Sequence, residues 1–180
     1  MRKQTVRMAL CGVLCGLSIV IMAASLVDPA LNYCIPMVAG ALLLVPSIEF
    51  GTGTALTAYA AVSLLSMILL PTKEAAIMYI FLFGIYPIIK KYFERIPHRV
   101  PEYLAKFAFF NLTAVAAVSL VTFVLTEGTL DDGTLGKWAV PLLLLCGNIA
   151  FPLYDYTLTL AVTLYIRRLQ GPLRKTLHIK

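Results

Sequence analysis

The sequence predicts an all-α polytopic membrane protein, and three observations predict it: the composition, the length of the apolar segments and the placement of the charges. The chain of 180 residues is 60% hydrophobic and only 13% charged, whereas soluble domains are about a quarter charged. A mean hydropathy of +0.87 leaves too little polar surface to coat a water-soluble globule. Because the apolar segments lack the alternation of a membrane barrel, we expect helices.

Six segments carry this apolar character, and we expect them to cross the membrane as helices, for which about 17–25 residues are needed. The chain shows no polar linker or repeat that would divide it, so we expect a single six-helix membrane domain over residues 1–180. The predicted helices cover residues 6–27, 35–49, 53–71, 74–91, 104–126 and 138–167.

Each boundary has a local reason. The first segment follows a basic head, and since it is long enough to span, we interpret it as a membrane helix instead of a cleaved leader. The short second segment is separated from the third by "EFGTG" (49–53), where two glycines and a glutamate interrupt the apolar run. The fourth closes with the basic stretch "KKYFERIPHRVPEY", the polar loop "EGTLDDGTLGK" follows the fifth, and the long sixth is broken by Pro152.

The basic residues predict the topology. With six spans, the two termini share one side with the loops that follow the second and fourth spans, and thirteen of the fifteen basic residues lie on that side. This asymmetry predicts that both termini are cytoplasmic. The net charge of +6 therefore indicates topology and not nucleic-acid binding. The thirteen are Arg2, Lys3, Arg7, Lys90, Lys91, Arg95, Arg99, Lys106, Arg167, Arg168, Arg174, Lys175 and Lys180, and the other side has Lys73 and Lys137.

Asp155 is the most unusual residue of the last span. In "NIAFPLYDYTLTLAV" (148–162) it has no Lys or Arg within ten residues on either side, and a charge at mid-membrane costs about 2.5–3.5 kcal/mol. Two explanations remain open: a carboxylate that faces a pocket for a small polar ligand, or one that forms a hydrogen bond with another helix. At helical spacing it shares a face with Asn148, Phe151 and Thr159, and Tyr154 and Tyr156 flank it.

Other polar and aromatic residues are compatible with a pocket but are more typical of a core. Tyr79, Phe83 and Tyr86 share one face of the fourth span, as residues at helical spacing do. Glu49, at the turn after the second span, and Asn111, in the fifth, are expected to have structural roles.

Small residues line one face of the first span. Ala9, Gly12 and Gly16 are three or four residues apart, and such a face lets another helix approach closely. The approaching helix can belong to this chain or to another subunit.

Several chemistries are absent from the sequence. Cys11, Cys15, Cys34 and Cys146 lie in or beside apolar segments without a metal-binding spacing, so we expect packing residues and neither disulfides nor a metal site. No G-x-x-x-x-G-K-[ST], H-E-x-x-H or G-x-S-x-G motif occurs, and both histidines lie in basic cytoplasmic segments. We therefore predict that the chain is not an enzyme and needs no cofactor.

Three stretches share a pattern with a known family. The basic start "MRKQTVRMALCGVLCG" precedes the small-residue face. This face is similar to the family's A-x-x-x-A pattern, with Val13 at the position of the second alanine. The stretch "IPMVAGALLLVPSIEFGTGTALTAYAAVSLL" repeats small residues through spans two and three, and a long polar loop precedes the last span. With six spans and internal termini, these features resemble the substrate-binding S component of an energy-coupling factor (ECF) transporter.

The resemblance implies a function and partners. An S component binds a vitamin or similar micronutrient from outside the bacterial cell membrane, in which it is a multi-pass protein surrounded by lipid. A membrane coupling subunit docks on the small-residue face, here Ala9, Gly12 and Gly16. Two cytoplasmic ATPases drive that subunit, and the S component is thought to topple in the membrane and release its cargo inside.

The resemblance also implies a binding site. By analogy, the pocket opens outward between spans four to six and is capped by the loop between spans one and two. Asp155 would then suit a donor-rich or cationic group of the ligand. The ligand-binding residues implied in this sequence are Asn32, Tyr33, Tyr79, Asn148, Tyr154 and Asp155.

Two other classes of protein remain open. A non-transporting scaffold of the rod-shape-determining type has a comparable size and helical layout, needs no polar pocket, and would use Asp155 as a bond between helices. An intramembrane enzyme would lose a chemical activity when Asp155 and Glu49 are changed, but the sequence lacks the clusters of His and Ser that such an enzyme would use.

Overall fold

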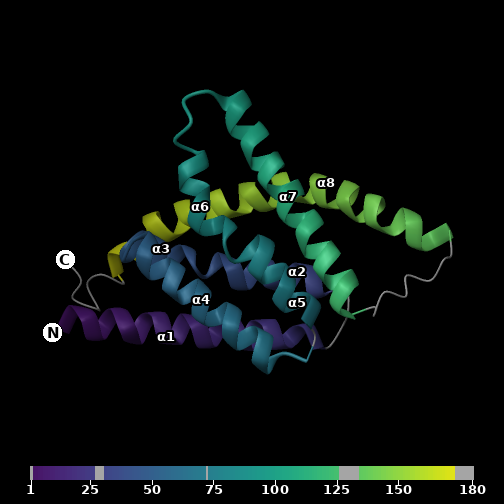
Figure 1. Ribbon diagram of the computed structural model, residues 1–180. Helices are drawn as coiled ribbons and strands as arrows, with labels where there is room; N and C mark the ends of the chain where they lie inside the picture. The colour runs from purple at the N-terminus through teal and green to yellow at the C-terminus, as the bar shows by residue number, and fades with distance from the viewer. Residues whose placement is uncertain (1, 27–30, 72, 126–133, 173–180) are drawn as a thin grey trace.

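The computed structural model describes residues 2–26, 31–71, 73–125 and 134–172, and within these ranges the chain is helical and contains no strand (Figure 1). This confirms the all-α polytopic class. The described helices that are long and apolar enough to cross a membrane cover Gln4–Leu26, Thr52–Leu69, Lys73–Phe93, Arg99–Val121 and Leu144–Pro172, and a shorter apolar helix covers Tyr33–Glu49.

The elements follow the order that the sequence predicts. The N-terminal half contains α1 (Arg2–Ala23), η1 (Ala24–Leu26), α2 (Leu31–Ala41), α3 (Leu44–Glu49) and α4 (Thr52–Leu69). The C-terminal half contains α5 (Lys73–Met78), the π-helical turn η2 (Tyr79–Phe83), α6 (Tyr86–Phe93), α7 (Arg99–Leu125), α8 (Thr134–Leu164) and the π-helical turn η3 (Tyr165–Leu169).

The second span is two helices, α2 and α3, where the sequence analysis predicted one helix over 35–49. Pro46 explains the break, because proline has no N–H to donate to the carbonyl four residues earlier. The carbonyl of Leu42 instead accepts a 3.3 Å hydrogen bond from the N–H of Val45. The chain then turns at Gly51, whose φ of 86° is readily adopted only by glycine.

The fourth span, α5–η2–α6, is the most buried of the membrane-crossing helices. It contacts α2, α4 and α7, and it contains a turn in which the N–H of Gly84 donates to the Tyr79 carbonyl at 2.7 Å. A five-residue bond of this kind is a π-bulge, which is frequent at functional sites. The residues around this turn are therefore candidates for a functional site.

The last two spans are longer than predicted. α7 begins at Arg99, five residues before the predicted start at 104, because Pro101 lies in its first turn, where the missing N–H costs nothing. α8 and η3 together reach Leu169. The N-terminal end of α1 and the C-terminal end of α8 lie at the same end of the bundle (Figure 1), as six crossings require. The charge pattern predicts that this end is cytoplasmic, and it is therefore called the inner end.

The buried apolar side chains form two clusters. The larger cluster joins the α5–η2–α6 span to α7 and α8, with α3 at its inner end. The second cluster joins α1, α2 and α4 to the other side of the same span. The fourth span is therefore the central helix that both halves of the core share.

Candidate ligand-binding cavity

An apolar cavity of about 560 Å³ lies between α2, the α5–η2 segment, α7 and α8. None of the described residues that line it is charged, and most of its wall is aromatic, aliphatic or sulfur-containing. Its size is in the range of small-molecule sites, about 300–1,000 Å³. The aromatic and sulfur-containing residues of the wall are Tyr33, Cys34, Met37, Met78, Phe83, Phe110, Cys146, Phe151 and Tyr154.

The cavity lies in the outer half of the bundle. Tyr33 and Cys34 belong to the outer end of α2, and Val118 belongs to the outer half of α7. Cys34, Cys146 and Leu142 line the cavity and are exposed, so its mouth lies between α2 and α8. The cavity lies in the half of the bundle in which the resemblance implies a pocket, and its opening toward the outside stays a prediction.

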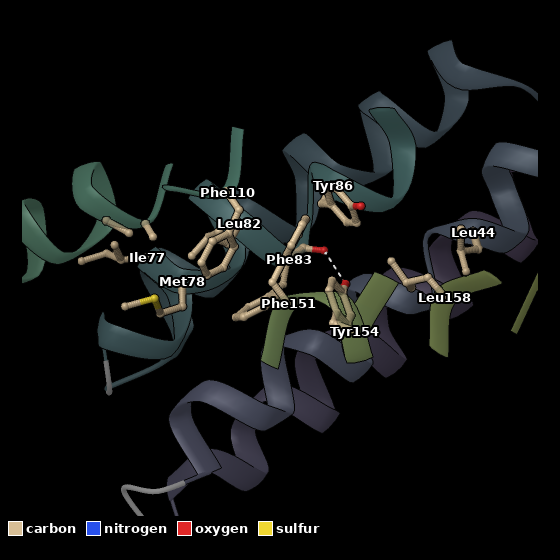
Figure 2. Packing of buried hydrophobic residues seen from close by; sticks show 12 residues of the cluster. Leu44, Ile77, Met78, Leu82, Phe83, Tyr86, Phe110, Phe151, Tyr154 and Leu158 are labelled. Atoms are coloured by element: carbon tan, nitrogen blue, oxygen red, sulfur yellow. Dashed lines mark hydrogen bonds between the residues drawn. The ribbon is translucent and has the colours of Figure 1, made fainter. Parts of the chain in front are cut away.

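Aromatic rings line the inner end of the cavity, and Figure 2 shows Phe83, Phe110, Phe151 and Tyr154 close together. Phe83 and Tyr154 meet edge to face with ring centroids 5.3 Å apart, and Phe110 stacks on Phe151 at 4.7 Å. Such pairs stabilise by about 0.5–1.5 kcal/mol beyond the area they bury. These rings, here called the cavity floor, separate the cavity from the inner half of the protein.

A hydrogen bond between two helices holds the floor in place. The Tyr154 hydroxyl donates to the Phe83 carbonyl at 3.3 Å (Figure 2). That carbonyl lacks its usual helical donor because Pro87, four residues on, has no N–H, and the N–H of Ile88 donates to Ile85 instead. The π-bulge and the proline thus create an acceptor in the fourth span, and α8 supplies its donor.

Asp155 lies on the inner side of the floor, among charged partners from two other helices. Lys90 of α6 forms an ion pair with its carboxylate, and Lys106 of α7 donates to it at 3.0 Å. The Tyr86 hydroxyl donates to the same carboxylate at 2.6 Å. Asp155 therefore joins α8 to α6 and α7.

Two glutamates, Glu94 and Glu102, complete this group. The five charged residues and the hydrogen-bonded tyrosine are here called the ion cluster: Tyr86, Lys90, Glu94, Glu102, Lys106 and Asp155. The Lys90 ammonium is 3.1 Å from Glu94, and the Lys106 ammonium is 2.8 Å from Glu102. Both lysine side chains are only 4% exposed. Burial of this kind is tolerated because each charge has an opposite partner.

The ion cluster alters the interpretation of two basic residues. The sequence analysis counted Lys90 and Lys106 among the cations that mark the cytoplasmic side. Both lie near the inner ends of their helices, but their side chains turn into the bundle and neutralise Asp155. Both are therefore paired within the protein, so they are weaker markers of topology than the unpaired basic residues of a loop would be.

The geometry favours the structural explanation for Asp155. Its carboxylate has partners on other helices, and Asp155 is not among the residues that line the cavity. That it binds a ligand stays an untested prediction. The side-chain amide of Asn148 also has a partner on another helix: it and the amide of Asn111 exchange two hydrogen bonds of 2.9 Å. This pair joins α7 to α8, in agreement with the structural role expected for Asn111.

The remaining predicted ligand residues divide between the cavity and the core. Tyr33 and Tyr154 line the cavity. Tyr79 does not: it is fully buried against Tyr59 in the second cluster, with ring centroids 6.1 Å apart. The side chain of Asn32 lies outside the described residues.

The small-residue face of α1 is open in the described part of the protein. Ala9, Gly12 and Gly16 are exposed, and a Cβ atom added to either glycine would have no neighbour within 4 Å. The face is therefore not used to pack α1 against the described helices of this chain.

The sequence analysis missed the ion cluster, although a signal for it was present. Lys90 and Glu94, like Glu102 and Lys106, are spaced four residues apart, the spacing of paired charges on a helix. It also missed the apolar wall residues such as Met37, Met78 and Phe110, for which the sequence offered no distinguishing pattern.

Fold and site together define a class: an all-α multi-pass membrane protein with an apolar cavity in its outer half and a buried ion cluster in its inner half. Among the residues that the structure describes, no group of His, Cys, Asp and Glu is placed to hold a metal ion. Comparisons of the chain with known protein families, with curated proteins and with solved structures found no match. The functional argument therefore depends on the geometry of this site.

Proposed function

We propose that this protein is the substrate-binding membrane subunit of an ECF-type ABC importer in the bacterial cell membrane, and that it takes up a vitamin or similar micronutrient from outside. The observation that carries the proposal is the 560 Å³ cavity with its mouth in the outer half of the bundle. Concave apolar cavities of this size are the usual sites of small-molecule binding.

The one-sided shape of the cavity favours uptake by a subunit over passage through a channel. On the inner side of the floor, the ion cluster ties α6, α7 and α8 together. A molecule that enters from outside therefore meets a closed inner end. Release into the cell requires movement of the subunit itself, and such movement is the step that an ATP-driven coupling subunit provides in the family that the sequence resembles.

The exposed small-residue face of α1 supports the presence of a membrane partner. Ala9, Gly12 and Gly16 present a flat strip that no described helix of this chain covers. In lipid, small residues allow close helix–helix packing, which is a main source of association between membrane helices. We assign this strip to the coupling subunit, which two cytoplasmic ATPases drive.

A thermal-stability screen tests the proposal. The purified protein in lipid nanodiscs is heated with vitamins, their precursors and other micronutrients, beside two variants of α7. Ala114 lines the cavity, so Ala114→Phe fills it; Ala116 is exposed, so Ala116→Phe is the matched control. We expect at least one molecule to raise the midpoint of wild type and Ala116→Phe but not of Ala114→Phe. A complete screen without such a molecule would contradict the proposal.

A non-transporting scaffold is the second candidate, and one observation favours it. The polar groups that the resemblance assigned to a ligand, Asn148 and Asp155, form hydrogen bonds with other helices instead. A scaffold would bind its protein partners equally well as wild type and as Ala114→Phe. It would also show no thermal shift with any small molecule.

A further inference from the structure

The chemistry of the cavity wall restricts the kind of molecule that can bind there. We propose that the cavity selects a neutral molecule with a flat aromatic or conjugated ring system and rejects charged molecules, an inference that rests on the proposed function. It departs from the expectation that Asp155 would meet a cationic group. The proposal follows in three steps from the absence of charge in the described wall, the shape of the wall and its remaining hydrogen-bonding capacity.

The first step concerns charge. The described lining residues include no Lys, Arg, Asp or Glu. Asp155, on the other side of the floor, is already paired with Lys90 and Lys106. A charged group placed against the described wall near the floor would lose its hydration without gaining a charged partner, and the burial of an unpaired charge is strongly unfavourable.

The second step concerns shape. Phe83, Phe110, Phe151 and Tyr154 converge at the inner end of the cavity. Aromatic rings prefer to stack on a flat ring or to meet its edge. Met78 also lines the cavity, and methionine is flexible and makes favourable contacts with ring edges. This wall fits a flat ring better than a flexible acyl chain.

The third step concerns hydrogen bonds. The Tyr154 hydroxyl donates its proton to the Phe83 carbonyl, which leaves its oxygen able to accept one bond. The amide of Asn148 is already used within the pair with Asn111 and is not part of the wall. Near the floor, a ligand can therefore place one hydroxyl or N–H donor against Tyr154, but little other polarity.

The test uses three probes that share a ring and differ in charge: 2-naphthol, which is neutral, 2-naphthoate, which is anionic, and 2-naphthylmethylammonium, which is cationic. Dissociation constants are measured at pH 7 in nanodiscs containing wild type, Ala114→Phe or Ala116→Phe. Binding that remains in Ala114→Phe is partition into lipid and is subtracted. Because Ala114→Phe could fail to fold, Ala150→Phe, which fills the same cavity from α8, is measured beside it.

We expect 2-naphthol to bind wild type and Ala116→Phe, and both charged probes to bind about 100-fold more weakly. After the same subtraction, Ala150→Phe should show no binding of 2-naphthol. A charged probe that binds within tenfold of 2-naphthol at the same site would overturn the inference. Displacement of 2-naphthol by methyl palmitate would do so too, since the cavity would then be a site for acyl chains.

The outcome separates this inference from the proposed function. If a micronutrient from the thermal screen binds in the cavity but 2-naphthol does not, the ligand class is wrong and the substrate-binding subunit stands. If neither binds, both proposals fail.

Discussion

The Tyr86 hydroxyl donates a 2.6 Å hydrogen bond to the Asp155 carboxylate, which ties the central helix to α8. The ring of the same tyrosine meets Phe151 of the floor with centroids 5.1 Å apart. Tyr86 therefore belongs to the ion cluster and also contacts the cavity floor. Through this residue, the outer site and the inner charges form one continuous packed unit.

The ion cluster should be essential for stability. Asp155→Ala removes a negative charge that pairs with the buried Lys90 and Lys106. Breaking a buried pair in this way costs about 3 kcal/mol or more. The free energy of unfolding, measured in mixed micelles, should fall by about that amount. Tyr156→Ala is the control, because Tyr156 is the next residue and is exposed. Equal stability of the two variants would contradict the role of Asp155.

The hydrogen bond from Tyr154 to Phe83 should depend on Pro87. Tyr154→Phe leaves the Phe83 carbonyl without a donor and should cost about 1–2 kcal/mol. In a Pro87→Ala background a backbone N–H is restored, so the same change should cost less. The measurement is a double-mutant cycle on unfolding free energy, and strict additivity would show that the two donors do not compete for one carbonyl.

The amide pair should couple α7 to α8. In Asn111→Ala, Asn148→Ala and the double variant, a thermodynamic cycle should give a coupling energy of about 1 kcal/mol, typical of polar contacts between membrane helices. Thr113→Ala is a suitable control for α7, since the Thr113 hydroxyl bonds within its own helix. A coupling energy near zero would mean that each amide finds another partner.

Gly40 should tolerate no side chain. A Cβ atom at this position would overlap the carbonyl of Phe83, so Gly40→Ala should push α2 away from the central helix and destabilise by about 3 kcal/mol. Gly16→Ala is the matched control, since no atom lies within 4 Å of its added Cβ. Similar thermal midpoints for the two variants would show that α2 is not held as described.

The small-residue face of α1 should matter for assembly and not for folding. Gly12→Leu combined with Gly16→Leu adds side chains to an open surface, so the thermal midpoint should stay close to that of wild type. Affinity purification from the native host should recover the coupling subunit and the ATPases with wild type but not with this variant. Recovery of the same partners with both forms would remove this face from the interface.

The fold followed from the sequence to a large extent because lipid leaves few choices for a long apolar segment. The break in the second span was also encoded, by Pro46 at the position that deprives Leu42 of its donor. The π-bulge at Tyr79–Phe83 was not foreseeable, because no residue type specifies it. The bulge packs against α2 and α7, which are distant in sequence.

The site was less predictable, and Asp155 shows why. Within the sequence it has no basic neighbour for ten residues, yet its partners Lys90 and Lys106 are 65 and 49 residues away. Only the packing of three helices brings them together. The cavity wall was equally hidden, because a Met or Phe that lines a cavity is indistinguishable in sequence from one in a packed core.

The central claim is that a small molecule binds in the outer cavity, and Cys146 at the mouth allows the most direct measurement. The rate at which a maleimide modifies this thiol is followed by mass spectrometry, with and without the molecule that stabilises the protein most in the thermal screen. We predict that the molecule slows modification of Cys146 several-fold in wild type but not in Ala114→Phe, and leaves Cys11, which lies outside this cavity, unchanged. An unchanged rate at Cys146 in wild type would contradict the account.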